Sequence, residues 1–221
     1  MGKIKKNAMR INVGCGQSPT KGWRNFDNSF SLCLSKFVFI SNLLYKLKLL
    51  NQIQYEFIQF CSLNHIEYGD PIKGLPVTDG SIEVFYSSHM IEHLDRLDAD
   101  KLLQEARRVL RPGGIIRLAV PDLCKLIDEY VELRDADKFI TRTCLCLSRP
   151  RTIAQRFKTI FMGGRNHQWM YDAESLRRLL TSYGFVNVDI MPPGKTKIAN
   201  PGPLNLKERW VESVYVEAEN P

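Results

Sequence analysis

Short apolar segments and longer amphipathic segments alternate along most of this chain. Seven of the short segments have the length and residue types of β-strands, at 9–13, 22–27, 65–70, 82–88, 115–120, 185–190 and 213–218. Between them, apolar residues three or four positions apart predict helices, for example over 123–134 and 173–183. This alternation predicts an α/β fold with a mostly parallel sheet.

The clearest helical pattern follows the strand at 82–88. Leu102, Leu103 and Ala106 lie on one face of it, and we expect Asp98 to cap its N-terminus. The sequence Pro112-Gly113-Gly114 should end it.

Two segments depart from the alternation, and the first is 31–62. It is rich in Leu, Ile, Phe and Tyr and carries Lys36, Lys46 and Lys48, with no acid before Glu56. One interpretation is a crossover helix whose apolar face lies on the sheet. The other is a lid or a membrane-surface helix, because its polar positions are lysines. Its longest apolar run, 37–45, is far below the roughly 20 residues of a membrane span. We expect a helical cover beside the functional site.

The second segment is 136–170, where basic residues far outnumber the single acid, Asp137. These residues could form only a solvated surface. Alternatively, the segment is an insertion that binds the substrate, with Arg151 and Arg156 close enough to converge on one phosphate or carboxylate. We expect the second case and therefore an anionic substrate.

Composition narrows the class of protein. The chain has 221 residues, which fits one α/β domain over 1–221. Its net charge of +7 favours anionic partners without naming one. Six cysteines form no Cys-x-x-Cys pair and no Cys/His cluster, so we expect free thiols, a reducing cytoplasmic location and no metal site. No signal peptide or transmembrane segment is apparent, although peripheral membrane contact stays open.

The glycines after the first strand carry the strongest chemical signal. Gly14 and Gly16 flank Cys15 where the chain should leave a buried strand and turn tightly beneath a ligand. Asp27 ends the second strand, where a carboxylate can accept two ribose hydroxyls in a Rossmann-like site. A Gly-x-Gly pair alone is weak evidence for a nucleotide-binding site. The evidence is stronger here because the glycines are followed in order by the acid and by further alternating strand and helix patterns.

Taken in order, these motifs resemble those of class I S-adenosylmethionine-dependent methyltransferases. The match is closest to a small bacterial type that carries Gly-Trp-x-Asn-x-Asp and is often linked to cell-surface polysaccharide synthesis. The residues that carry it are Ile11-Asn12-Val13-Gly14-Cys15-Gly16, Gly22-Trp23 with Asn25 and Asp27, Gly69-Asp70 before Leu75-Pro76, Ser88-His89 with Glu92-His93-Leu94, Leu110 to Gly114, and Tyr183-Gly184-Phe185.

The resemblance implies a Rossmann-like seven-stranded sheet, mostly parallel with an antiparallel last strand, and helices on both faces. It implies S-adenosylmethionine as the cofactor. The residues expected to bind it are Asn12, Gly14, Cys15, Gly16, Asp27, Asp70 and Ser88. Gly14 and Asp27 lie 27 − 14 = 13 positions apart, against roughly 20 in the usual pattern. The first crossover helix should therefore be shortened or absent.

Three histidines deserve separate interpretations. His89, at a strand end, is our candidate for a general base, and the alternative is a helix-start histidine bonded to backbone. His167 could face the methyl acceptor or lie in a surface loop. We expect Glu92 and His93 to be structural, tying their helix to neighbouring loops.

The function we expect is O-methylation of a small molecule or of a sugar in a glycan precursor. Nucleic acid is disfavoured, because the basic segment has few aromatics and no recognisable RNA-binding module. An NAD-dependent oxidoreductase is disfavoured because Pro19 stands where the third glycine of Gly-x-Gly-x-x-Gly would be. A non-catalytic binding subunit is the other alternative, and the intact Gly14, Gly16, Asp27 and Asp70 argue against it.

Overall fold

The fold is organised around one seven-stranded sheet. The structure is a computed structural model and describes residues 9–145 and 166–221. The strands are β1 (Met9–Val13), β2 (Arg24–Asp27), β3 (Glu67–Tyr68), β4 (Ile82–Ser88), β5 (Leu110–Pro121), β6 (Val186–Met191) and β7 (Ser213–Glu219). Their order across the sheet is β3-β2-β1-β4-β5-β7-β6. The first five in this order are parallel, and β7 is antiparallel to both of its neighbours. The predicted fold class is confirmed.

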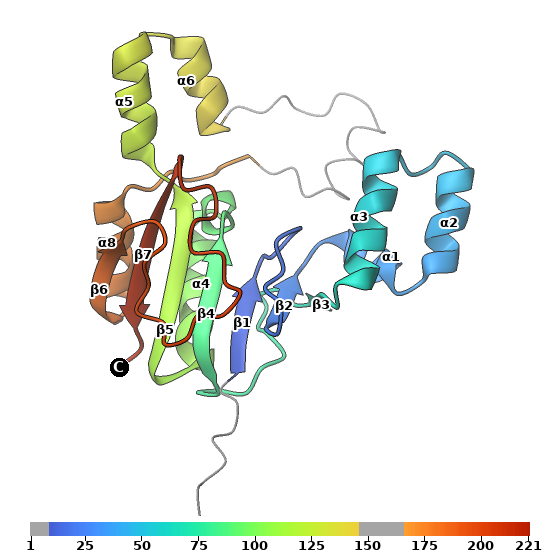
Figure 1. Cartoon of the computed structure of the whole chain (residues 1–221), viewed down its shortest axis with the longest axis horizontal. Helices are drawn as coiled ribbons and strands as arrows, with labels where there is room; N and C mark the ends of the chain where they lie inside the picture. The colour runs from blue at the N-terminus through green and yellow to red at the C-terminus, as the bar shows by residue number, and fades with distance from the viewer. Residues whose placement is uncertain (1–8, 146–165) are drawn as a thin grey trace, which may run out of the picture.

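One face of the sheet is covered by helices. α4 (Arg96–Val109) and α8 (Ala173–Ser182) pack there (Figure 1). Leu102 and Leu103 of α4 and Leu176 and Leu180 of α8 are fully buried in one core with the apolar side chains of the central strands. α4 begins at Asp95, whose side chain accepts from the Asp98 amide, so the prediction of Asp98 as the cap is wrong. Because two aspartates lie three residues apart, the sequence pattern fits either register.

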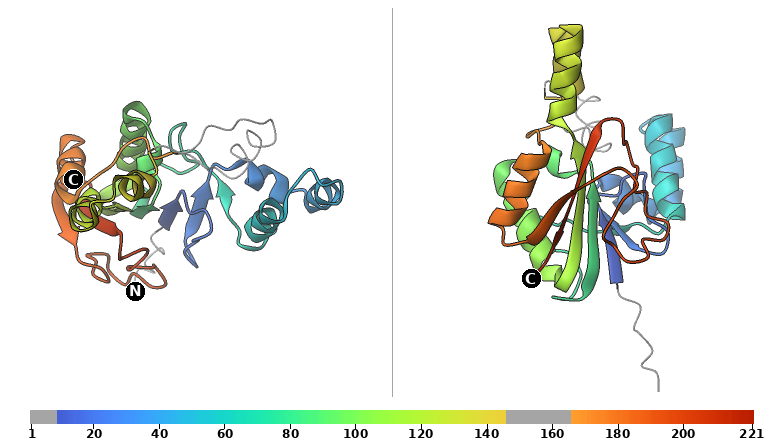
Figure 2. Two further views of the ribbon diagram at one scale, coloured as in Figure 1. Left: turned by 90° about the horizontal axis from the view of Figure 1, so that it is seen from above. Right: turned by 60° about the vertical axis from the view of Figure 1, so that its left-hand side comes forward.

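The other face is covered by an irregular segment. Residues 192–212, between β6 and β7, cross the sheet on the side opposite α4 (Figure 2). Ile198 and Leu204 of this segment pack on Val84 and Tyr86 of β4. The structure therefore differs in this detail from the helices expected on both faces. Residues 14–23 form turns and no helix, as the short spacing between Gly14 and Asp27 predicts.

A buried ion pair fastens this segment to the sheet. Arg117 of β5 and Glu217 of β7 are both fully buried, and Arg117 Nη1 lies 2.6 Å from Glu217 Oε1. Arg117 Nη1 also donates to the Lys195 carbonyl at 3.0 Å, and the Lys197 amide donates to Glu217 Oε2 at 2.7 Å. The two charges thus serve as anchor points for the backbone of 195–197.

Three helices form an extension beyond the edge strand β3. They are α1 (Phe30–Ser35), α2 (Val38–Lys46) and α3 (Gln52–Leu63), and they pack on one another (Figure 1). α1 touches β3, while α2 lies outermost. The interpretation of a helix with its apolar face on the sheet is therefore wrong for α2. Within the described residues, no helix has both the length and the apolar character to cross a bilayer.

α2 buries polar residues and exposes apolar ones, which is the reverse of an ordinary surface helix. Its buried residue is Ser41, and Asn42 accepts a hydrogen bond from the Tyr55 hydroxyl of α3 at 2.9 Å. Its apolar side chains point away, with Phe39 80% exposed and Leu47, just after the helix, 59% exposed. An amphipathic surface helix normally buries its apolar stripe and exposes its polar one.

A helical hairpin stands above the carboxyl edge of β5. It consists of α5 (Leu123–Leu133) and α6 (Ala136–Thr143), and Figure 1 shows it projecting past the strand ends. Lys138 and Arg142, which belong to the basic segment, both pair with Glu129 of α5, at 2.9 and 3.3 Å. A single-turn 3₁₀ helix, η1 (Ile91–His93), follows β4 at the same edge.

Candidate active site

The glycine turn lies at the carboxyl end of β1, where ligands bind in open α/β sheets. Gly14 and Gly16 have φ of +70° and +48°, a left-handed conformation that favours glycine. The amides of Gly14 and Cys15 both donate to the Phe26 carbonyl of β2, at 2.8 and 3.1 Å. A Cβ on Gly14 would lie 2.5 Å from Met90 Cγ, whereas one on Gly16 would meet nothing within 4 Å. Gly14 is thus required by packing, and Gly16 leaves backbone open to a ligand.

Asp27 is fixed directly beside this turn. Its Oδ2 accepts from the Gly16 amide at 3.0 Å, and its Oδ1 accepts from the Ser29 amide at 2.7 Å. Both oxygens keep further acceptor capacity, because a carboxylate oxygen can accept two hydrogen bonds. The carboxylate is therefore held in place by backbone and can still accept hydroxyl groups.

Asn12 and Cys15 are buried within the turn. Asn12 is 2% exposed, and its amide donates to the Ser18 carbonyl at 2.9 Å and to Thr20 Oγ1 at 3.2 Å. Burial raises the pKa of the Cys15 thiol well above its usual range, and the charge of Asp27 adds to this. Burial also raises the pKa of Cys61, on α3, to about 12. The hydrogen bonds of Asn12 hold the loop in place. The raised pKa values of Cys15 and Cys61 favour the protonated thiols.

Asp70 follows β3, the neighbour of β2. It is 8% exposed, its Oδ1 accepts from the Ile72 amide at 3.1 Å, and Lys73 Nζ lies 3.3 Å from its Oδ2. Asp27 and Asp70 therefore stand at the ends of two adjacent parallel strands. Both acids therefore lie at the edge of the sheet where ligands bind in open α/β sheets.

Ser88 and His89 lie at the end of β4, which pairs with β1. His89 has φ +50°, and its amide donates to the Ala119 carbonyl at 2.9 Å. Its ring is nearly buried, with Nε2 2.8 Å from Ser213 Oγ and Nδ1 3.4 Å from Glu92 Oε1. If the proton is on Nδ1, this nitrogen faces the carboxylate and Nε2 accepts from the Ser213 hydroxyl. The imidazole is thus fixed from both sides.

His167 joins the same site from far along the chain. The amides of Gln168 and Trp169 donate to the Glu92 carbonyl at 2.7 and 3.2 Å, and these two bonds hold the loop to η1. The rings of His167 and His93 meet edge to face, with centroids 4.9 Å apart. Burial lowers the pKa of His167, against the opposing charge of Glu92. His167 thus lies in a loop, half-buried against His93 and close to Glu92, and its role toward an acceptor stays a prediction.

Glu92 and His93 were expected to tie their helix to neighbouring loops, and both contact residues 166–169 as expected. Their side chains also lie beside His89 and His167. The available signal was the spacing His89-x-x-Glu92-His93, which puts three polar side chains on one short turn. Ser213 carried no signal, because it lies over a hundred residues from His89. Arg151 and Arg156, predicted to bind the acceptor, lie outside the described residues.

Comparisons with known proteins bear on part of this site. A family model described as a methyltransferase domain matches residues 50–118, which include β3, β4, η1, α4 and most of β5. Residues 50–118 thus resemble a methyltransferase domain. This match is consistent with the expected cofactor, S-adenosylmethionine, and the turn at Gly16 beside Asp27 leaves backbone open to such a ligand.

Two solved structures share the fold of this chain. One is a Thermotoga maritima S-adenosylmethionine-dependent methyltransferase, described as a possible histamine N-methyltransferase. It has 13% identity and a TM-score of 0.50, covering 96% of this chain and 82% of its own. The other is a Haloferax volcanii protein assigned as a methyltransferase and solved with the Trm112 methyltransferase activator. It has 14% identity and a TM-score of 0.51, covering 99% of this chain and 84% of its own.

A curated protein of Streptomyces fradiae, the uncharacterized 37.1 kDa protein of transposon TN4556, is 41% identical over 68 residues. The match covers 31% of this chain and about a fifth of that relative, 19%.

Proposed function

We propose that this protein transfers a methyl group from S-adenosylmethionine to a hydroxyl oxygen of a sugar in a glycan precursor or of a related small molecule. The observation that carries the proposal is the fixed His89 imidazole at the end of β4, next to the strand that leads into the glycine turn. The cofactor, when bound, offers its methyl group on a sulfonium, so the leaving group is already activated.

The protein must then position an acceptor and remove its proton. A hydroxyl is a poor nucleophile until it loses that proton, so O-methylation calls for a base. His89 is the group we assign to this role, with Glu92 placed to stabilise the imidazolium that forms. Asp27 would hold the ribose hydroxyls, Asp70 the adenine amino group, and Ser88 would lie near the sulfonium. Asn12 and Cys15 would shape the turn from below.

Binding and turnover test the proposal separately. Calorimetry should detect S-adenosylhomocysteine and no binding of NAD, and tight NAD binding would overturn the family assignment. His89→Gln should abolish methyl transfer to a sugar acceptor while leaving S-adenosylhomocysteine affinity within about twofold. His65→Gln, at an exposed histidine remote from the site, is the matched control. Full activity of His89→Gln would show that it is not the base.

We further propose that residues 136–170 contribute the acceptor site and that the acceptor is anionic. Support comes from His167, whose ring meets that of His93, and from the amides of 168–169, which bond to the Glu92 carbonyl. Lys138 and Arg142 are partly neutralised by Glu129, which leaves Arg151 and Arg156 as the assigned anion ligands. Reversing the charge of both should abolish methyl transfer and leave cofactor affinity intact. Loss of cofactor binding, or full activity, would contradict the assignment.

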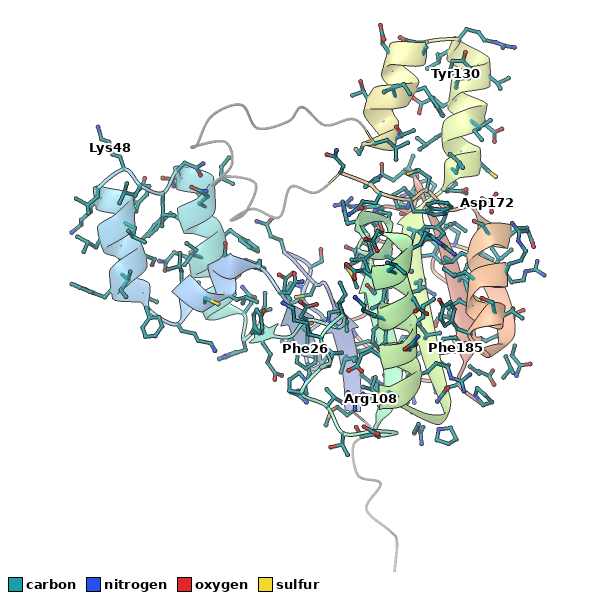
Figure 3. All side chains as sticks on the ribbon, turned by 180° about the vertical axis from the view of Figure 1, so that it is seen from behind. Phe26, Lys48, Arg108, Tyr130, Asp172 and Phe185 are labelled. Atoms are coloured by element: carbon teal, nitrogen blue, oxygen red, sulfur yellow. The ribbon has the colours of Figure 1, made fainter. Side chains whose placement is uncertain are left out.

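The exposed face of α2 favours an acceptor that is anchored in a membrane. We define this face as Phe39, Ile40, Leu43 and Leu47, with Lys36, Lys46 and Lys48 beside it. Exposed apolar side chains flanked only by cations suit the boundary of an anionic bilayer, where apolar groups enter the acyl region and lysines meet headgroups. Lys48 lies at the outer end of the helical extension (Figure 3). Nine residues lie in the plane of such a surface and do not cross it.

Vesicle co-sedimentation of the full chain tests this face. We expect binding to vesicles of phosphatidylglycerol and phosphatidylcholine, weaker binding to phosphatidylcholine alone, and loss of binding in high salt. Phe39→Ser with Leu43→Ser should reduce partitioning at least tenfold, whereas Leu97→Ser, equally exposed on α4, should not. Absence of binding to either vesicle would refute the proposal. If the double variant instead converts a dimer to a monomer in sedimentation velocity, the face is a protein interface.

A further inference from the structure

We propose that Glu92, His93 and His167 bind a divalent transition-metal ion beside the methyl-transfer site. Each of the three offers one ligand atom, and these atoms all lie within 4.8 Å of one another. Glu92 and His93 are neighbours in the sequence, whereas His167 follows His93 by 74 positions and reaches it only through the fold.

The carboxylate of Glu92 is the observation that points to a cation. Glu92 is fully buried, and neither of its oxygens has a hydrogen-bond partner within the described residues. His89 Nδ1 lies 3.4 Å from Oε1 and carries a charge only when the imidazole is protonated. A buried carboxylate is costly unless it is paired, hydrogen-bonded or bound to a metal. His167 Nδ1 is likewise buried without a hydrogen-bond partner.

Hydrogen bonds from the neighbouring loop hold the backbone and one ring of the three residues in place. The Glu92 carbonyl accepts two amides of 168–169, and the His93 carbonyl accepts from Gln168 Nε2 at 3.1 Å. His93 Nδ1 lies 3.4 Å from the Asn166 carbonyl, which would orient its ring. Metal-binding histidines usually have such a partner for their other nitrogen. Ligand bonds of about 2.0–2.2 Å hold two ligand atoms at most about 4.4 Å apart, so metal binding requires side-chain rotations that bring the three atoms closer together.

The donor set indicates the kind of ion. One carboxylate and two imidazoles suit Zn²⁺, Co²⁺, Mn²⁺ or Fe²⁺, whereas Mg²⁺ and Ca²⁺ prefer oxygen ligands. Three protein ligands leave at least one position open. This open position is the basis of a role in catalysis.

The role that follows rests on the proposed methyl transfer. A hydroxyl oxygen of the acceptor would take the open position, and the ion would lower the pKa of that hydroxyl as it does for bound water. The proton then passes to His89, the oxygen forms its bond to the methyl carbon, and the bond from that carbon to sulfur breaks. The sulfonium becomes a neutral thioether and the acceptor becomes an ether, so charge and atoms balance.

Metal binding can be measured without cofactor or acceptor. The full chain, treated with EDTA and dialysed, should bind one equivalent of Zn²⁺ in calorimetry, and Co²⁺ should give a visible absorption band. His93→Gln, His167→Gln and Glu92→Gln should each weaken Zn²⁺ binding at least tenfold and alter the Co²⁺ band. His65→Gln should change neither. Because Glu92→Gln could affect folding, circular dichroism accompanies each variant, and the two histidine variants decide the case.

The outcomes separate this site from the proposed function. If Zn²⁺ binds at one equivalent through these residues but no methyl transfer occurs, the metal site stands and the proposed function fails. If S-adenosylhomocysteine binds and EDTA-treated protein transfers methyl groups at full rate with no Zn²⁺ bound, the function stands and the metal site is refuted. Zn²⁺ binding that survives both histidine variants also refutes the site.

Discussion

At the scale of single residues, Gly14 shows how packing and backbone conformation act together. Gly14 and Gly113 have nearly the same φ, +70° and +71°. An alanine at either position should therefore lower the free energy of unfolding by about 1–2 kcal/mol, because a residue with a Cβ is strained in the left-handed conformation. They differ in surroundings, because a Cβ on Gly14 would lie 2.5 Å from Met90 Cγ and one on Gly113 would meet nothing within 4 Å. We expect Gly14→Ala to be more destabilising by a further 1–3 kcal/mol, roughly the cost of overpacking.

Urea unfolding of the two variants checks this difference. Combining Gly14→Ala with Met90→Ala should recover part of the excess, because the clash is with that side chain. Equal destabilisation by Gly14→Ala and Gly113→Ala would mean that Met90 can move away at little cost.

Asp27 is the residue whose removal should affect the cofactor most directly. Asp27→Ala deletes the acceptor for the Gly16 and Ser29 amides as well as the proposed ribose contact. We expect S-adenosylhomocysteine to bind more weakly by about 1–3 kcal/mol, the range for a lost charge-assisted hydrogen bond. Calorimetry on folded protein measures it, with Asp128→Ala, an exposed acid on α5, as the control. Unchanged affinity would remove Asp27 from the cofactor site.

At the scale of elements, the N-terminus of α4 gives a direct test. The Asp95 side chain accepts from the Asp98 amide at 2.8 Å, while the Asp98 carboxylate meets Lys101 Nζ at 3.0 Å on the surface. Loss of a capping side chain costs about 1 kcal/mol. Loss of an exposed ion pair costs roughly 0.5 kcal/mol or less. Asp95→Ala should therefore lower the free energy of unfolding more than Asp98→Ala, and the reverse order would restore Asp98 as the cap.

Elements with local signals could be predicted from the sequence. β4 at 82–88 and the start of α8 at Ala173 were placed correctly, because apolar periodicity and capping residues are local. α2 could not be placed, because its apolar periodicity does not say whether the stripe faces the protein or the outside. β5 begins at Leu110, before the predicted 115, because Pro112 to Gly114 join the strand instead of separating it from α4.

At the scale of the whole molecule, the site depends on contacts between distant parts of the chain. The positions of Gly14, Asp27 and Asp70 at one edge of the sheet could be predicted, because each ends or follows a parallel strand, while their roles toward a cofactor stay predictions. His89 with Ser213, and Glu92 with His167, could not be predicted, because only the packing of β7 and of residues 166–169 brings them together. The position of residues 192–212 on one face of the sheet could not be predicted either, because it depends on contacts with a buried ion pair between β5 and β7.

That pair, Arg117 and Glu217, carries the last prediction. Glu217→Gln leaves the fully buried guanidinium of Arg117 without its counterion, a change that typically costs about 3–5 kcal/mol. Replacing both, Arg117→Met with Glu217→Leu, leaves no uncompensated charge but orphans the Lys195 carbonyl and the Lys197 amide. We therefore expect the double variant to be more stable than Glu217→Gln but less stable than the original protein.

Arg177→Ala, which removes an exposed pair with Glu174, serves as the control and should change the free energy of unfolding by less than about 1 kcal/mol. Urea unfolding measures all three, and a Glu217→Gln variant as stable as the original would show that 192–212 is held by its apolar contacts alone.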